Sequence, residues 1–257
     1  MMPSRPQILG LEISPGSQQR LLGSIRQHLV SGEGLAHVVT ANPEYVMIAR
    51  KDASFAEAVR EAGVVTVDGS GLAIAVRLLH PAVESERYTG VMLTPDLAQL
   101  SSETGAGIFL LGAGPRIADD AARELKARYP GTNIVGTWSD GSPRREDDDE
   151  TILRIRQSGA SIVLVAYGAP AQIHWIHRNE KALDAAGVRI VSGIGGALDY
   201  ISGHTPWAPA IVRRFGLEWL YRLLREPWRW RRQLVLPQFA TLVLIEFARS
   251  RLRRGVE

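Results

Sequence analysis

The 257-residue chain contains no cysteine, which excludes disulfide bonds and thiolate metal sites but leaves the redox compartment undetermined. No uncharged apolar run approaches the roughly 20 residues that a membrane-spanning helix needs. The opening segment, MMPSRPQILGLEIS, lacks the apolar core of a signal peptide. We therefore expect neither export nor an ordinary transmembrane anchor.

Most of the chain has no net positive charge, because the positive charge is concentrated near the C-terminal end. From Ile211 onward there are 11 Arg, no Lys and 4 Glu, a net charge of +7, so the overall +3 leaves −4 for residues 1–210. A basic segment of this kind seeks phosphates on nucleic acid, on an anionic membrane surface or in a diphosphate ligand.

What the chain does have is a strand followed by a helix, about six times over. Helical spacing follows most of the strands, and the alternation predicts an α/β fold with a Rossmann-like, mainly parallel sheet flanked by helices. Apolar and β-branched runs place the strands at 8–13, 37–40, 64–67, 107–111, 133–138, 161–166 and 189–192. The clearest helices are predicted at 17–30, 94–103 and 116–129.

The C-terminal part has a different character, and we expect residues 208–257 to form an Arg-rich helical appendage to an α/β domain of residues 1–207. Its apolar piece, 234–248, is broken by Pro237 and would span only about 22 Å as a helix. Arginine and tryptophan flanking apolar residues favour a helix lying in a membrane interface. The alternatives are packing on the main domain or on another subunit, so a homo-oligomer stays open.

Polar residues gather at the predicted strand ends, where open α/β sheets bind ligands. Asp68 follows the strand 64–67 directly and precedes a Gly-Ser-Gly turn into a helix, so it either caps that helix or serves chemistry. Thr40 and Asn42 stand at another strand end, where Asn42 either caps a helix or binds a polar ligand. Arg87, in a polar loop, is either a surface charge or a clamp for a phosphate or carboxylate.

Glycine turns follow further strands, at Gly112-Ala113-Gly114 and at Gly195-Gly196, and such turns can cradle phosphate. The first is not a dinucleotide fingerprint, because the third glycine would fall at Ile117. The missing glycine argues against NAD binding, although the turn keeps a nucleotide-dependent oxidoreductase as one alternative for the function. A non-catalytic phosphate- or membrane-binding module, based on the arginine-rich tail, is another alternative.

A metal site is not predicted. His174 and His177 lie one helical turn apart, but the sequence offers no plausible third ligand near them. The acidic run 147–150 most simply begins a helix, where carboxylates suit the positive end of the dipole.

Seven motifs in order resemble the WecG/TagA/CpsF family of bacterial glycosyltransferases (glycosyltransferase family 26). The likeness runs from about His37 to Arg232. The motifs are TANPE at 40–44, DGSGL at 68–72, ERYTG at 86–90, FLLG at 109–112, GAPAQ at 168–172, GIGGALD at 193–199 and GLEWLYR at 216–222.

The resemblance implies an inverting transferase that uses neither metal nor cofactor. Such enzymes move a sugar from a UDP-sugar to a polyprenyl-diphosphate-linked sugar in the synthesis of cell-surface polysaccharides. They work at the inner face of the plasma membrane as peripheral proteins, with no nucleic-acid partner. The donor stays open among N-acetylmannosamine, its uronic acid, glucose and glucuronate.

The resemblance also implies roles for single residues. Asp68 matches the proposed general base, and further matching residues line the active pocket, namely Thr40, Asn42, Arg87 and Gln172. The basic appendage is implied to close over this pocket and to contact the membrane and the donor diphosphate. The chain departs from the family at Ala171 and Ile173, where many members carry Lys and Glu, and at Trp207, where Arg is usual.

The chemistry of the reaction agrees with these roles. Glycosyl transfer needs a base for the acceptor hydroxyl proton, and inversion in one displacement needs only one carboxylate. The leaving UDP needs positive charge. Arg222 and Arg225 are the candidates for it, helped by the backbone amides at Gly112, Gly195 and Gly196.

Overall fold

The computed structural model describes residues 5–32, 34–209, 211–212, 216–225, 227 and 230–254, without the side chains of residues 222, 231, 232, 253 and 254. Its centre is a six-stranded parallel sheet with the strand order β4-β3-β8-β7-β5-β6. The strands are β3 (Ala36–Ala41), β4 (Val64–Val67), β5 (Ile108–Gly112), β6 (Ile134–Trp138), β7 (Ile162–Ala166) and β8 (Ile190–Gly193). The predicted α/β class and parallel sheet are thus confirmed.

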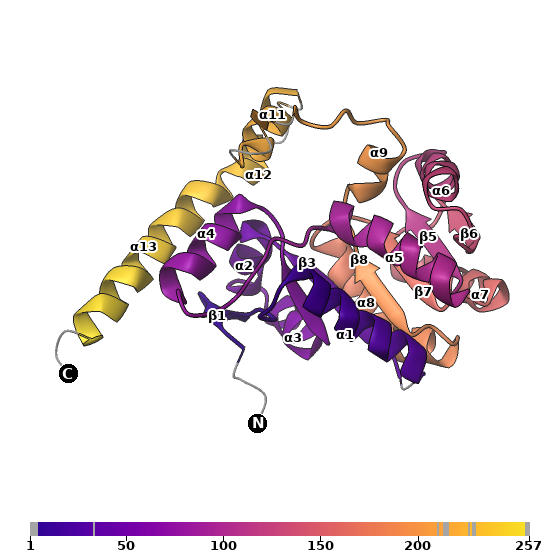
Figure 1. Cartoon of the computed structure of the whole chain (residues 1–257), viewed down its shortest axis with the longest axis horizontal. Helices are drawn as coiled ribbons and strands as arrows, with labels where there is room; N and C mark the ends of the chain where they lie inside the picture. The colour runs from indigo at the N-terminus through magenta and orange to yellow at the C-terminus, as the bar shows by residue number, and fades with distance from the viewer. Residues whose placement is uncertain are drawn as a thin grey trace.

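Helices cover both faces of the sheet (Figure 1). One face packs on α1 (Gln18–Ser31), α5 (Gly90–Thr104), α6 (Ile117–Arg128) and α9 (Ala197–Ile201). The other packs on α2 (Pro43–Ala49), α3 (Ala53–Glu61), α4 (Ser70–Leu79), α7 (Asp148–Ser158) and α8 (Ala171–Ala185). Because both faces are buried, the central strands read as continuous apolar runs, and Val38 and Val39 point to opposite cores.

The chain reverses its winding between β3 and β8. These strands are hydrogen-bonded neighbours, yet α2, which follows β3, lies in one apolar layer and α9, which follows β8, lies in the other. In an open parallel sheet such a switch point leaves a crevice at the carboxyl ends of the strands. The fold therefore places a ligand site beside Thr40 and Gly193.

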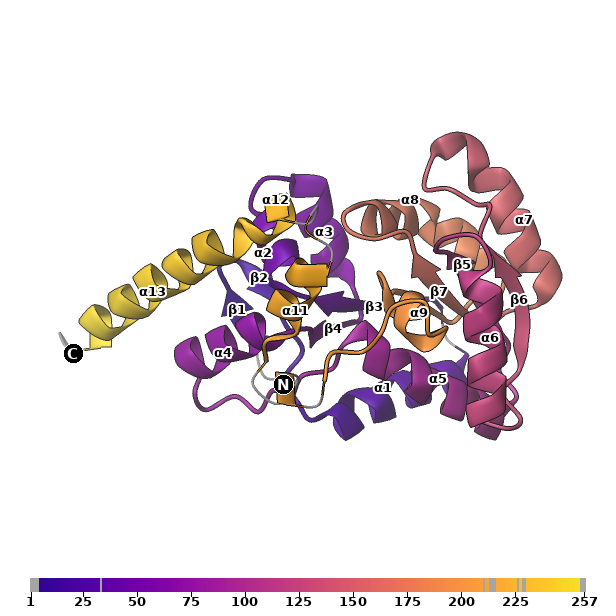
Figure 2. The same ribbon diagram turned by 90° about the horizontal axis from the view of Figure 1, so that it is seen from above.

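The last described elements are α11 (Glu218–Arg225), α12 (Trp230–Gln233) and α13 (Val235–Arg254). Helix α13 lies along α4 and α2 at the end of the molecule opposite β6 and α7 (Figure 2). It buries Phe239 and Val243 in the core beneath it. Pro237 does not break this helix, contrary to the prediction, because it lies in the first turn, where its missing N–H has no helical partner to lose.

The segment Ile8 to Ile13 was predicted as the first strand of the sheet, and this prediction is wrong. The chain there forms a separate antiparallel hairpin of β1 (Gln7–Ile8) and β2 (Leu11–Glu12). Its turn residues, Leu9 and Gly10, both have positive φ, as a tight two-residue hairpin turn requires. Helix α5 also begins at Gly90, earlier than predicted, since the Thr89 hydroxyl caps it by accepting from the Met92 N–H.

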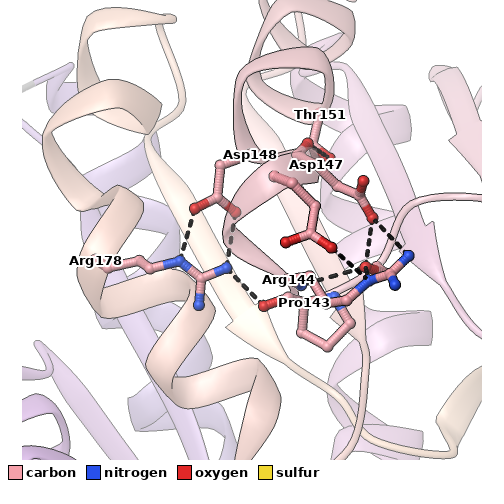
Figure 3. A network of polar contacts seen from close by, with 8 residues as sticks. Pro143, Arg144, Asp147, Asp148, Thr151 and Arg178 are labelled. Atoms are coloured by element: carbon pink, nitrogen blue, oxygen red, sulfur yellow. Dashed lines mark hydrogen bonds and ion pairs between the residues drawn. The ribbon is translucent and has the colours of Figure 1, made fainter.

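The acidic run begins α7, as predicted. Two of its carboxylates have further partners, drawn in Figure 3. Asp148 accepts two hydrogen bonds of 2.7 Å from Arg178 of α8, which also donates to the Pro143 carbonyl. Asp147 accepts from the Ser142 hydroxyl. The run therefore joins α7 to α8 through a half-buried ion pair.

Candidate active site

A cavity of about 1290 Å³ opens at the carboxyl ends of the strands around the switch point. Its floor comes from the ends of β3 and β4 and from the turn after β8, and its walls from α4, α11 and α13. It brings together most of the predicted site residues, namely Thr40, Asn42, Asp68, Arg87, Gln172, Gly195 and Gly196. Gly112 and Arg225 are not among its lining residues, and the side chain of Arg222 lies outside the described part.

Asp68 stands at the end of β4 and is half-buried. Its backbone N–H donates to the Ala41 carbonyl at 2.6 Å, and its Oδ2 accepts from the Gly90 N–H at 3.4 Å. The N-cap of α4 is Gly69, with φ +84°. The residue at the N-cap position of α4 is thus Gly69 and not Asp68, and Asp68 lines the cavity.

Thr40 and Asn42 both hold backbone in place beside this carboxylate. The Thr40 hydroxyl donates to the Gly193 carbonyl at 3.3 Å and so joins the ends of β3 and β8. Asn42 is the N-cap of α2, where its Oδ1 accepts from the Tyr45 N–H at 3.1 Å. Asn42 therefore caps α2 and also lines the cavity.

Gln172 is 2 % exposed and bonds to three separate segments. Its Oε1 accepts from the N–H groups of Gly168 and Gly195, each at 3.0 Å, and its Nε2 donates to the Tyr45 hydroxyl at 2.7 Å. A Cβ at Gly193 would lie 2.7 Å from that Nε2. Gln172 thus ties together the loops after β7 and β8 and the helix α2.

The loop carrying Arg87 is fixed against β4. The Tyr88 N–H donates to the Val67 carbonyl, and the Thr66 hydroxyl donates to the Tyr88 carbonyl at 2.6 Å. The Tyr88 hydroxyl is buried and donates to Asp96, and burial, with the Asp96 carboxylate, raises the pKa of Tyr88 above its usual value. Arg87 therefore emerges from a rigid base next to Asp68.

The Arg87 guanidinium is held by α11. Its Nη2 lies 2.9 Å from Oε1 of Glu218, with about a third of each side chain exposed. Its Nε is buried and has no hydrogen-bond partner among the described residues. The Ser70 hydroxyl, in the turn after Asp68, donates to the Gly216 carbonyl at 2.8 Å. Two contacts thus fasten the segment 216–218 over the Asp68 turn, and neither partner of Arg87 or Ser70 was assigned from the sequence.

The cavity continues away from these polar groups between two helices. On α4 the lining residues follow helical spacing on one face, and on α13 they do the same. We call this part the α4–α13 groove; it is lined by Gly71, Ile74, Ala75, Leu78, Leu236, Phe239, Ala240, Val243 and Leu244. Its side chains are entirely apolar.

Some glycines and departures from the family pattern have structural explanations. A Cβ at Gly112 would lie 2.7 Å from the Tyr167 ring, so this glycine allows close packing against Tyr167, which itself lines the cavity. The Gly195 N–H, predicted to bind phosphate, already donates to Gln172. Ile173 is fully buried in the core, whereas Trp207 lines the cavity, with its ring 5.6 Å from that of Tyr200.

The two histidines of α8 have separate partners. His174 Nε2 lies 3.0 Å from Oδ2 of Asp52, the residue that caps α3. His177 lies near Glu61 and Glu180, with candidate ligand atoms within 4.8 Å of one another. Glu61, from α3, and Glu180 thus lie near His177, but His174 is not part of this group. None of these three residues lines the cavity.

The comparisons with known proteins point to one family. The model of the glycosyl transferase WecG/TagA/CpsF family matches residues 6–253. An N-acetylglucosaminyldiphosphoundecaprenol N-acetyl-beta-D-mannosaminyltransferase of Bacillus spizizenii (strain ATCC 23059 / NRRL B-14472 / W23) is 33% identical over 209 residues, which are 81% of this chain and 79% of that protein. A protein of the same name from Bacillus subtilis (strain 168) is 32% identical over 224 residues, which are 86% and 84%.

Proposed function

The chain belongs to the WecG/TagA/CpsF family of glycosyl transferases, and on this premise we propose that it transfers an N-acetylmannosamine-type or related hexosyl group from a UDP-sugar to a polyprenyl-diphosphate-linked sugar, with inversion and without metal. The observation that carries the proposal is the Asp68 carboxylate on the floor of a cavity that also holds Arg87. The names of the relatives support N-acetylmannosamine as the group transferred and a diphosphoundecaprenol-linked N-acetylglucosamine as the acceptor.

Asp68 is the base in this proposal. The acceptor hydroxyl loses its proton to the carboxylate as its oxygen attacks the anomeric carbon, and the bond from that carbon to the UDP oxygen breaks. The contact of Oδ2 with the Gly90 N–H orients the carboxylate. Such a positioned base contributes about 10²–10⁴-fold to the rate.

In this proposal the guanidinium group of Arg87 binds a diphosphate group. Its present partner, Glu218, is a single carboxylate in a partly exposed ion pair, which is a weak interaction. A diphosphate offers more charge and more acceptor oxygens to a guanidinium fork. A bound diphosphate therefore displaces Glu218 and can also take up the buried Nε–H of Arg87.

The remaining predicted residues divide into contact and positioning roles. Thr40 and Asn42 face the sugar across the floor of the cavity, whereas Gln172 acts through the loops that it holds. Arg225 of α11 donates to the Tyr221 hydroxyl, and Tyr221 lines the cavity. We assign Arg222 and Arg225 to the leaving diphosphate once α11 has shifted toward it.

Membrane association is part of the proposal. No helix in the described ranges is both long enough and apolar enough to cross a bilayer. The appendage of residues 208–257 instead carries exposed apolar side chains beside arginines, among them Leu224, Trp230 and Leu252. This composition suits a helix lying in the interface of an anionic membrane, and we place the protein peripherally at the inner face of the plasma membrane.

The test is release of UDP from a panel of UDP-sugars in the presence of EDTA, with a short-chain polyprenyl-diphosphate-N-acetylglucosamine as acceptor. We expect acceptor-dependent release from one donor, UDP-N-acetylmannosamine first among them. The matched control is Asp68→Asn, which keeps the shape of the side chain and removes the base. Release that needs a divalent cation, or that proceeds equally without acceptor, would contradict the proposal.

A further inference from the structure

The α4–α13 groove has no part in the chemistry proposed so far. The cavity of about 1290 Å³ exceeds the roughly 300–1,000 Å³ typical of small-molecule pockets. Its polar end, at Asp68 and Arg87, provides the groups that the transfer needs. The apolar end between the two helices provides space for another kind of chemical group.

Two side chains in this groove are exposed although they are large and apolar. Ile74 on α4 is 62% exposed and Leu244 on α13 is 60% exposed. Beneath them Ala75, Phe239 and Val243 are buried and close the floor. A groove with a buried apolar floor and solvent-exposed apolar edges suits a flexible apolar chain, which would cover the exposed edges.

The groove begins at the catalytic end and leads outward. Helix α4 starts two residues after Asp68, and the stretch from Gly71 to Leu78 extends about 10 Å along its axis. Leu78 also lines a second cavity, of about 550 Å³, further along the same pair of helices. Arg77 and Arg251 line that second cavity, which places positive charge where the path opens to the surface.

We propose that the α4–α13 groove binds the isoprenoid units next to the diphosphate of the lipid-linked acceptor. This proposal rests on the proposed function, because a polyprenyl diphosphate is the ligand that joins an anionic group to an apolar chain. The diphosphate lies at Arg87, and the chain runs between α4 and α13 toward Arg77 and Arg251. The arginines there meet anionic lipid headgroups where the rest of the chain enters the membrane.

The experiment measures binding of farnesyl diphosphate, dimethylallyl diphosphate and inorganic diphosphate to the full chain by calorimetry, without membrane and without donor. The wild-type protein is expected to bind farnesyl diphosphate about tenfold more tightly than dimethylallyl diphosphate, since the longer chain buries more apolar surface. In the double variant Ile74→Ser/Leu244→Ser this ratio should fall close to one. Leu153→Ser on α7, a 51% exposed leucine outside both cavities, is the matched control and should keep the ratio.

Three outcomes would overturn the proposal. Equal affinity for the two prenyl diphosphates in the wild type removes the basis for a tail site. A ratio that persists in the double variant places the tail elsewhere. A double variant that loses binding to phosphatidylglycerol vesicles but keeps its preference for farnesyl diphosphate identifies the groove as a membrane-contacting surface.

The test is separate from the activity assay. A protein that binds farnesyl diphosphate in the groove but transfers no sugar would contradict the proposed function and not the groove. A protein that transfers sugar with no dependence on chain length or on Ile74 and Leu244 would contradict the groove and not the function.

Discussion

Replacing Gln172 by alanine should lower the stability of the fold and should not act through a lost contact with the donor sugar. The change removes a 2 % exposed side chain whose Oε1 accepts from the part-buried N–H groups of Gly168 and Gly195 and whose Nε2 donates to the Tyr45 hydroxyl. Each buried group left unsatisfied costs about 1–3 kcal/mol. We therefore expect a loss of about 3–5 kcal/mol in the free energy of unfolding, or about 10 °C in Tm for a chain of this length.

The matched control lies on the same helix. Asn179 is also buried, but its amide donates to the carbonyl of Trp175 within α8, so Asn179→Ala leaves no polar group stranded and should cost about 1 kcal/mol. Urea denaturation followed by circular dichroism gives both values, and donor KM is measured on the same preparations. A Gln172→Ala protein of wild-type stability with only a raised donor KM would refute the positioning role and restore Gln172 as a sugar ligand.

Three further changes test the site and the core. Asp68→Asn should lower kcat by about 10²–10⁴-fold with an unchanged Tm, and near wild-type turnover would remove Asp68 as the base. Glu218→Gln frees Arg87 from its ion pair and should tighten binding of farnesyl diphosphate about two- to fivefold by calorimetry, whereas Glu103→Gln, which breaks the distant pair with Arg26, should not. Weaker binding of farnesyl diphosphate to Glu218→Gln would show that Glu218 serves the ligand. Burial, with a smaller contribution from His177, lowers the pKa of His37 from 6.5 to about 3. Between pH 6.5 and 5 His37 therefore takes up its proton only in the unfolded chain, so the free energy of unfolding of the wild type should fall by about 1.6 kcal/mol relative to that of His37→Leu. Parallel stability curves of the two proteins would refute the burial argument.

The sheet and the position of the site follow from local patterns. Each β-branched run followed by a glycine or polar turn and a helix predicts a parallel strand whose carboxyl end is exposed, so Thr40, Asn42 and Asp68 could be assigned to one edge before any contact was known. The error at Ile8 to Ile13 has a local cause as well. Leu9 and Gly10 both adopt positive φ, and a leucine gives no signal for that conformation.

The contacts across the cavity could not be predicted in the same way. Arg87 and Glu218 are separated by 131 positions, and Ser70 and Gly216 by 146. Nothing in the spacing of either residue indicates its partner. Gln172 illustrates the same limit, because its motif indicates that the glutamine matters, while only the packing of three loops shows that its amide bonds to backbone.

Helix α13 follows every other described element in the chain, and this order has a consequence for synthesis. Helix α13 covers apolar faces of α2 and α4 through Phe239 and Val243. During synthesis α2 and α4 leave the ribosome before α13 does. Domains fold in the order in which they are made, so a nascent chain ending before Val235 presents these faces to water. The wall of the cavity that α13 supplies therefore forms only after Val235–Arg254 has been made and has packed against α2 and α4.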